Sequence, residues 1–344
     1  MAEIDDWLNR MTEEALEPAL PICDPHHHLW DQRETFVYRY LLEEFFADMS
    51  GGHNIVSTVF LECEAYYRDI DRLGGDPNMA PVGETEFVRG MAAMADASYY
   101  GKTRVAAAIV GFADLRLGEG VKDILQAHIE AGGGRFRGIR HSTAHDENDG
   151  IMGAEHTAPN AGLLYDETFR RGFAQLAPLH MSFDSWFYHP QMPELIDLAQ
   201  AFPETPIVMD HVGAPLGIGP YAGRRDEIFA SWSKNVTALA KCPNVHVKLG
   251  GLAMKLTGFG HHKLEIPPSS EVLAEDWKPY LMHCIEAFGP ERCMFESNFP
   301  VDKASCAYTT LWNAFKRVAS DFSAGEKASL FHDTAARFYR IEED

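Results

Sequence analysis

The sequence PICDPHHHLWD at residues 21–31 begins like a buried β-strand and then places three histidines between two aspartates. Because side chains alternate between the two faces of a strand, His26 and His28 are expected to point to one face and His27 to the other. Two imidazoles on one face can bind a borderline metal ion or form hydrogen bonds with a polar substrate. The stretch therefore predicts a strand that ends in a functional site.

Seven more strand-like apolar segments follow along the chain, and segments with helical spacing of apolar residues separate them. Alternating strands and helices favour a parallel sheet, and eight such strands favour a closed (β/α)8 barrel, the TIM barrel. An open doubly wound sheet is the alternative, but histidines 26–28 occupy the position of its glycine-rich phosphate turn. The expected strands are residues 22–28, 54–62, 104–110, 135–140, 179–183, 207–213, 244–249 and 292–302.

The length of 344 residues suits a single barrel domain, expected at residues 21–344. Residues 1–20 are predicted to form a peripheral segment with an acidic helix. An extra helix is expected near the C-terminus of the chain. No segment approaches the roughly 18 consecutive apolar residues of a membrane helix. Six widely spaced cysteines without a C-x-x-C pair fit reduced thiols in a cytoplasmic protein.

The chain has 30 basic and 51 acidic residues, which gives a formal net charge of -21. Such a surface repels nucleic acids and anionic membranes, so neither is an expected partner. The expected partner is a small-molecule substrate, and the sequence is compatible with a homo-oligomer.

Polar side chains follow almost every expected strand. The active site of a (β/α)8 barrel forms at the C-terminal ends of its strands, so these side chains are expected to share one pocket. Burying so many ionisable groups without a purpose would be costly. They are His26 and His28, Glu62 and Glu64, Asp114, Arg140 and His141, Asp184 and Trp186, Asp210 and His211, Lys248, Glu296, Asn298 and Asp302.

Five motifs over roughly residues 20–340 resemble the amidohydrolase superfamily, and within it the amidohydrolase-2 branch of lactonases and decarboxylases. The resemblance implies hydrolysis of a lactone or, less often, decarboxylation of an aromatic acid, with or without a bound metal ion. By motif match it also implies that His26, His28 and His211 take metal or substrate positions and that Arg140 binds a substrate anion. The motifs are HHHLWD at 26–31, GIR at 138–140, QMPEL at 191–195, DHVG at 210–213 and SNFP at 297–300.

The chain departs from the family pattern at Asn298, where the family usually has aspartate. Because an amide cannot take a proton from water, hydrolysis would need another base. Asp302, Glu296, Glu62 and His211 are the candidates. On a regular strand Glu296 and Asn298 would share one face, and Asp302 is expected at the rim of the pocket.

Three histidines, His26, His28 and His211, could together bind one divalent ion, with zinc the first expectation and manganese the second. The missing aspartate removes a negative ligand, however, and three neutral imidazoles also suit a metal-free site that stabilises an oxyanion. Both a metal-dependent and a metal-free site therefore stay open.

The first hypothesis is a hydrolase that opens a lactone or related cyclic ester of a carboxylated or aromatic-derived substrate. Arg140, with Lys248 or His141, would hold the substrate anion, and Trp186 would provide an apolar wall. The second hypothesis is a metal-dependent decarboxylase of an aromatic acid. The third is a non-catalytic ligand-binding barrel that lacks the strand-eight aspartate.

Overall fold

The computed structural model describes residues 2–31, 38–152 and 160–342, and within them eight strands form one parallel sheet in chain order. Each strand pairs with the next one along the chain. The strands are β1 (Pro21–His27), β2 (Asn54–Leu61), β3 (Arg104–Gly111), β4 (Phe136–Arg140), β5 (Ser182–Ser185), β6 (Ile207–Met209), β7 (Val245–Leu249) and β8 (Cys293–Phe295).

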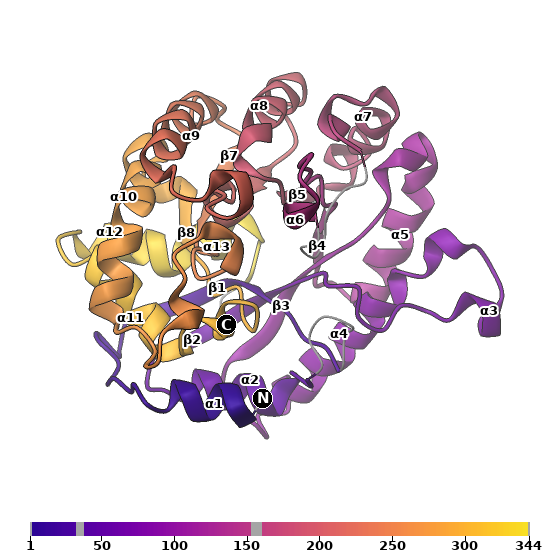
Figure 1. Ribbon diagram of the computed structural model, residues 1–344. Coiled ribbons are helices and arrows are strands. Elements are labelled where there is room, and N and C mark those ends of the chain that lie inside the picture. Colours follow the sequence, from indigo (N-terminus) through magenta and orange to yellow (C-terminus); the bar gives the residue numbers. More distant parts are fainter. Residues whose placement is uncertain (1, 32–37, 153–159, 343–344) are drawn as a thin grey trace.

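Helices surround the strands, as Figure 1 shows, because each crossover between parallel neighbours packs a helix on the outside of the sheet. None of the helices in the described ranges is long and apolar enough to cross a membrane. They are α1 (Ala2–Leu8), α2 (Leu42–Met49), α3 (Ile70–Leu73), α4 (Val82–Asp96), α5 (Val121–Gly132), α6 (Asp149–Met152), α7 (Glu167–Phe173), α8 (Met192–Ala201), α9 (Arg225–Leu239), α10 (Ser270–Phe288), α11 (Tyr308–Val318), α12 (Ala324–Ala328) and α13 (Thr334–Phe338).

The barrel closes through the segment that follows β8. The backbone N–H of Asn298 donates to the carbonyl of His26 at 2.9 Å, and the N–H of His28 donates to the carbonyl of Phe299 at 2.8 Å. The carboxylate of Asp24 adds a side-chain contact, since it accepts from the N–H of Ser297 at 3.0 Å. The predicted (β/α)8 barrel is confirmed.

Two strands, β6 and β8, are much shorter than the sequence indicated. β6 ends two residues before His211, whose φ is 55°, and β8 ends three residues before Asn298, whose φ is 53°. A left-handed residue turns the chain and ends the strict alternation of faces. The prediction that Glu296 and Asn298 share a strand face is therefore wrong, although both side chains remain buried.

The N-terminal ends of the strands are filled by side chains from the C-terminal part of the chain. The ring of Phe338 lies 4.8 Å from the ring of His246, the second residue of β7, in a tilted arrangement, and Tyr339 is fully buried. The extra C-terminal helices predicted from the sequence are α12 and α13, and the acidic N-terminal helix is the short α1. The apolar partners of α13 inside the barrel are Cys23, Val59, Leu61, Ala108, Val110, Val208 and Met294.

Candidate active site

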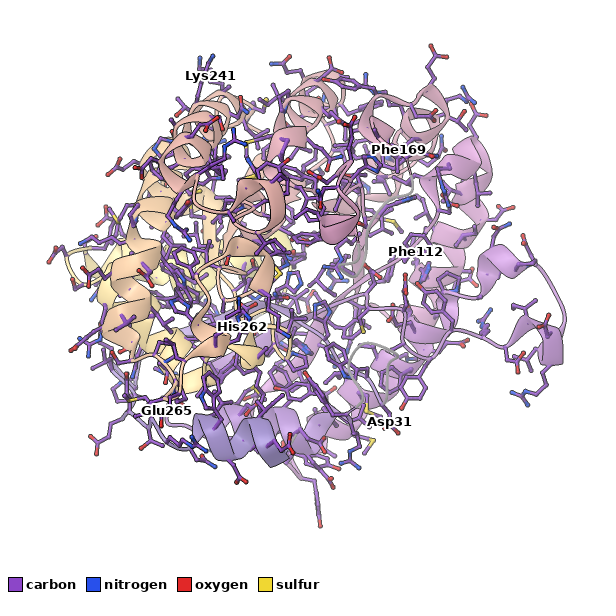
Figure 2. The ribbon with its side chains drawn as sticks, viewed as in Figure 1. Asp31, Phe112, Phe169, Lys241, His262 and Glu265 are labelled. Carbon is purple, nitrogen blue, oxygen red and sulfur yellow. The ribbon has the colours of Figure 1, made fainter. Side chains whose placement is uncertain are left out.

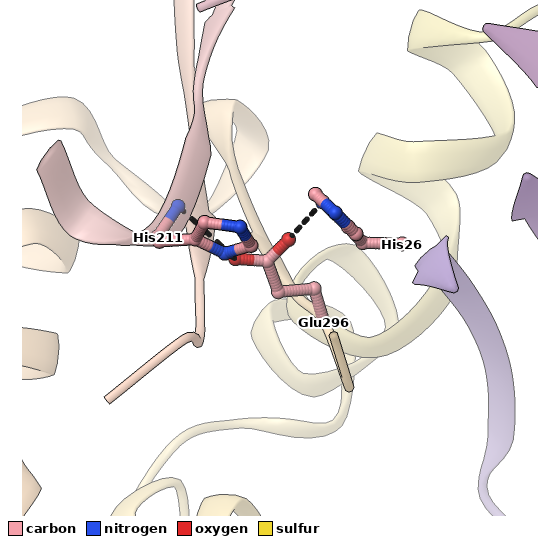
Figure 3. Close-up of side chains that lie close together, drawn as sticks. All are labelled: His26, His211 and Glu296. Atoms are coloured by element: carbon pink, nitrogen blue, oxygen red, sulfur yellow. Dashed lines mark hydrogen bonds and ion pairs between the residues drawn. The ribbon is translucent and has the colours of Figure 1, made fainter. Parts of the chain in front are cut away.

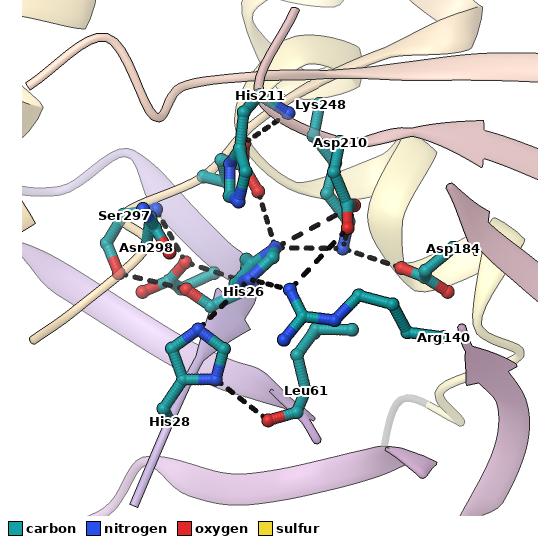
Figure 4. Close-up of polar contacts among 12 residues, drawn as sticks. His26, His28, Leu61, Arg140, Asp184, Asp210, His211, Lys248, Ser297 and Asn298 are labelled. Carbon is teal, nitrogen blue, oxygen red and sulfur yellow. Dashed lines mark hydrogen bonds and ion pairs between the residues drawn. The ribbon is translucent and has the colours of Figure 1, made fainter. Parts of the chain in front are cut away.

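Imidazole, carboxylate, amide and cationic side chains from the ends of β1, β2, β4, β5, β6, β7 and β8 meet inside the barrel. Figure 4 shows several of them and their polar contacts. All of them are at most 3% exposed, so their charges interact through protein rather than through water. The group comprises His26, His28, Glu62, Arg140, Asp184, Asp210, His211, Lys248, Glu296 and Asn298.

Glu296 joins two of the predicted histidines (Figure 3). Its Oε1 lies 2.6 Å from Nδ1 of His211 and accepts the backbone N–H of the same residue at 3.1 Å. Its Oε2 lies 2.8 Å from Nδ1 of His26. Because a carboxylate only accepts hydrogen bonds, the proton of the neutral His211 ring sits on Nδ1 and leaves Nε2 with a lone pair.

Two glycines after β7 make room for this pair. A Cβ atom on Gly250 would lie 2.4 Å from Cγ of Glu296, and one on Gly251 would lie 2.4 Å from Cβ of His211. Gly251 also has a φ of 68°, which side chains rarely adopt. Two consecutive glycines after a strand therefore indicate that other side chains approach the backbone closely there. The prediction from the sequence did not use this signal.

His28 is oriented by a backbone carbonyl. Its Nδ1 lies 2.9 Å from the oxygen of Leu61, so Nδ1 carries the proton, and its Nε2 faces Nε2 of His26 at 3.3 Å. Burial, followed by the charge of Lys248, lowers the pKa of His26 well below its usual value. His26 is therefore neutral, with its Nε2 beside Nε2 of His28 and its Nδ1 beside Oε2 of Glu296.

Arg140 is engaged by Glu62. Its Nε donates to Oε1 of Glu62 at 2.7 Å and its Nη2 to the carbonyl of Glu62 at 2.5 Å. Burial alone would lower the pKa of Arg140, but the carboxylates of Glu62 and Asp210 raise it above its usual value. Only Nη1, which lies 3.4 Å from Nε2 of His26, is turned toward the histidines.

Lys248 lies beside two carboxylates, so its contacts give no support to the prediction that it holds the substrate anion. Its side chain is fully buried, and its ammonium lies 2.6 Å from Oδ1 of Asp184 and 3.0 Å from Oδ1 of Asp210. It also lies 3.2 Å from Nδ1 of His26. Two carboxylates and one imidazole therefore surround the ammonium. Sequence reasoning placed Asp184 and Asp210 at strand ends but gave neither a role.

Asp302 is completely buried, so the prediction that it lies at the pocket rim is wrong. The amide of Asn298 donates to its Oδ1 at 2.9 Å. Burial raises the pKa of Asp302 well above its usual value, which keeps its carboxyl group neutral. A neutral carboxyl group is a poor base, and Glu296 is the strand-eight carboxylate that contacts the histidines.

His141 and Trp186 have different surroundings. The ring of Trp186 meets the ring of His211 edge-on at 5.1 Å, as an apolar wall would. His141 packs 5.1 Å from Phe112 and 5.2 Å from Phe169, the two rings labelled in Figure 2, and burial lowers its pKa to about 4. A neutral imidazole does not attract an anion, so the predicted role of His141 gains no support from these contacts.

The residues present fit a metal ion, though with a different ligand set from the three histidines. One ligand atom each of His26, His211 and Glu296 lies within 4.8 Å of the others. Among the described residues Oε2 of Glu296 accepts no hydrogen bond, although Nδ1 of His26 lies 2.8 Å from it. A cation bound by Oε2 of Glu296 and Nδ1 of His26 would stabilise this contact. In a metal-free site the nearest cation is the ammonium of Lys248, 3.2 Å from Nδ1 of His26.

The sequence matches the family described as Amidohydrolase over residues 23–341. Among curated proteins, y4mH of Sinorhizobium fredii, described as uncharacterized, is 34% identical over 342 residues, which cover 94% of this chain and 99% of that protein. An L-fucono-1,5-lactonase of Burkholderia multivorans is 29% identical over 69% of this chain and 72% of its own.

Among solved structures, an amidohydrolase from Burkholderia multivorans with bound Zn is 23% identical, with a TM-score of 0.71 over 93% of this chain and 99% of that one. At this identity the likeness supports the fold, while the family match and the relative from Sinorhizobium fredii cover nearly the whole sequence. The chain is therefore an enzyme of the hydrolase class and a member of the amidohydrolase family.

Proposed function

We propose that the protein is a lactonase in which His211, supported by Glu296, is the base that activates water. The contact of 2.6 Å between Nδ1 of His211 and Oε1 of Glu296 carries the proposal, because it supplies the carboxylate that Asn298 lacks. Lactonases among the relatives support the reaction class. The proposed pair follows the general logic in which a carboxylate orients an imidazole and stabilises its protonated form.

The reaction follows from the protonation states of these side chains. Nε2 of His211 takes a proton from water, and the hydroxide oxygen bonds to the lactone carbonyl carbon. Nη1 of Arg140 donates to the oxyanion of the tetrahedral intermediate. The ring C–O bond then breaks, and the proton on His211 passes to the leaving alkoxide, which gives a hydroxy acid.

A divalent ion held by His26, His211 and Glu296 would supply Lewis-acid polarisation of the carbonyl and a more acidic water. His211 would then be a ligand, so its role as the base belongs to the metal-free site. The zinc in the structure from Burkholderia multivorans makes zinc the first ion to test. Whether or not an ion binds, Glu296 and Lys248 orient His26, and Trp186 covers His211.

The charge inside the barrel favours a neutral substrate over the anionic one expected from the sequence. Four carboxyl groups face two cations, Arg140 and Lys248, and each cation is paired with at least one of them. An additional carboxylate would meet an excess of negative charge at low dielectric. We therefore place a neutral, hydroxylated lactone first. The four groups are those of Glu62, Asp184, Asp210 and Glu296.

Proton release from a panel of lactones tests the function. The panel contains neutral sugar lactones, including L-fucono-1,5-lactone, and a pyrone dicarboxylate, and a parallel assay measures carbon dioxide release from aromatic acids. We expect turnover of a neutral lactone and none of the aromatic acids. Carbon dioxide release without lactone turnover would instead identify a decarboxylase, the second candidate.

A further inference from the structure

A continuous row of polar contacts joins the C-terminal part of the chain to His26. The hydroxyl of Tyr339 donates to Oδ1 of Asp184 at 2.6 Å. The same oxygen accepts from the ammonium of Lys248 at 2.6 Å, and this ammonium lies 3.2 Å from Nδ1 of His26. All four side chains are fully buried, so no bulk water competes for these contacts.

Tyr339 enters the barrel from the end opposite the histidines. Its carbonyl accepts from Nε of Arg137, the second residue of β4, at 2.8 Å, and Nη2 of Arg137 reaches the carbonyl of Arg340 at 3.4 Å. The backbone around Tyr339 is thus held against β4. This contact fixes how far the hydroxyl of Tyr339 reaches into the barrel.

The hydroxyl of Tyr339 determines how Asp184 is held. Oδ1 of Asp184 accepts two hydrogen bonds, whereas Oδ2 accepts none from the residues that the structure describes. Without the hydroxyl, one contact to Lys248 would remain, and the carboxylate could rotate to offer either oxygen. Lys248 would follow it or turn toward Asp210, which lies 3.0 Å away, and its contact with His26 would lengthen.

We propose that Tyr339 is a positioning residue for the active site. Through Asp184 and Lys248 it sets the orientation of the His26 ring, so that the chemistry at one end of the barrel depends on a hydroxyl that enters from the other end. The kinetic part of this inference rests on the proposed lactonase function, whereas the orientation of His26 does not.

The test compares Tyr339→Phe with Phe338→Leu, a matched control in the same segment that removes apolar contacts and no hydrogen bond. For the lactone that is turned over, we expect Tyr339→Phe to lower kcat by about 10- to 100-fold with little change in KM. Phe338→Leu should lower the thermal midpoint and leave kcat unchanged. Wild-type kcat in Tyr339→Phe, or equal kcat losses in both variants, would overturn the proposal.

Nitrogen-15 spectra of labelled histidines give a readout without any substrate. The ring signals of His26, assigned with a His26→Gln variant, should shift in Tyr339→Phe and stay in place in Phe338→Leu. Shifted signals in a protein that opens no lactone would refute the proposed function and leave the positioning role standing, whereas unshifted signals would refute the positioning role.

An Asp184→Asn variant keeps the proposal testable if Tyr339→Phe does not fold. It retains the tyrosine and should shift the His26 signals in the same way. Where both single variants fold, the double variant should lose no more kcat than Asp184→Asn alone, because both changes act on one row of contacts. If the kcat loss of the double variant equals the product of the two single losses, Tyr339 acts independently of Asp184.

Discussion

Glu296 approaches Nδ1 of His211 to 2.6 Å with one carboxylate oxygen and Nδ1 of His26 to 2.8 Å with the other, inside a fully buried site. One side chain therefore orients two imidazoles that come from opposite regions of the sequence. It lies two residues from Asn298, so the segment after β8 brings a carboxylate to the histidines although residue 298 is an amide.

Replacing Glu296 with glutamine should lower kcat by about 100- to 10,000-fold, because the amide offers a donor where His211 also has one and so favours the wrong tautomer. KM should change little, since the residue touches histidines rather than substrate. Steady-state kinetics of Glu296→Gln measures this, with Glu291→Gln as a control at an exposed glutamate. A kcat close to wild type would remove Glu296 and His211 as the base pair.

Asp302→Asn should retain activity within about threefold of wild type, because the carboxyl group that it replaces is held neutral by burial and an amide has the same shape. Asn298 can still donate to the new amide oxygen. The measurement is kcat/KM on the same lactone. A loss of 100-fold or more, about the minimum for a general base, would assign that role to Asp302 instead.

Asn298→Asp restores the family residue but should destabilise this protein by about 1–3 kcal/mol, because it places a carboxyl group 2.9 Å from that of Asp302. The two groups would share a proton, which raises the pKa of the pair in the folded state. Stability would then fall as pH rises through that pKa. Urea unfolding between about pH 5 and about pH 8 should show a larger difference from wild type at the higher pH.

His27 should make folding sensitive to acid. Burial lowers its pKa from 6.5 to about 3, and its Nε2 lies 2.9 Å from Oγ1 of Thr58. A lowered pKa contributes stability above pH 6.5 that is lost as pH falls toward the folded value, and by about pH 5 the loss is about 2 kcal/mol. Urea unfolding of His27→Gln should lack this part of the slope, whereas His180→Asn, at an exposed histidine, should keep it.

Zinc should raise the thermal midpoint of the purified protein after dialysis against a chelator, since an ion that binds only the folded state stabilises it, by about 2.7 kcal/mol at a hundredfold excess over Kd. Glu296→Gln should remove most of this rise, and Glu291→Gln none of it. No shift with zinc or manganese in the wild-type protein would favour the metal-free site.

The barrel could be predicted from the sequence because eight apolar segments alternate with helical ones, a pattern that depends on local periodicity. His26 and His211 could be placed in one site for the same reason, since both follow a strand. The contacts of Lys248 and Asp302 could not be predicted, because they depend on which side chains face each other across the barrel. Left-handed residues at His211 and Asn298 also end the alternation of strand faces in a way that no strand pattern indicates.

The position of Tyr339 in the sequence determines when its contact with Asp184 can form during synthesis of the protein. A ribosome synthesises His26 early and Tyr339 more than 300 residues later, and the exit tunnel delays the release of the last part further. The histidines can meet as the strands assemble, but Asp184 and Lys248 acquire their hydroxyl partner only once the C-terminal segment is free to enter the barrel. A nascent chain would thus lack the hydrogen bond between Tyr339 and Asp184 until Tyr339 has left the ribosome.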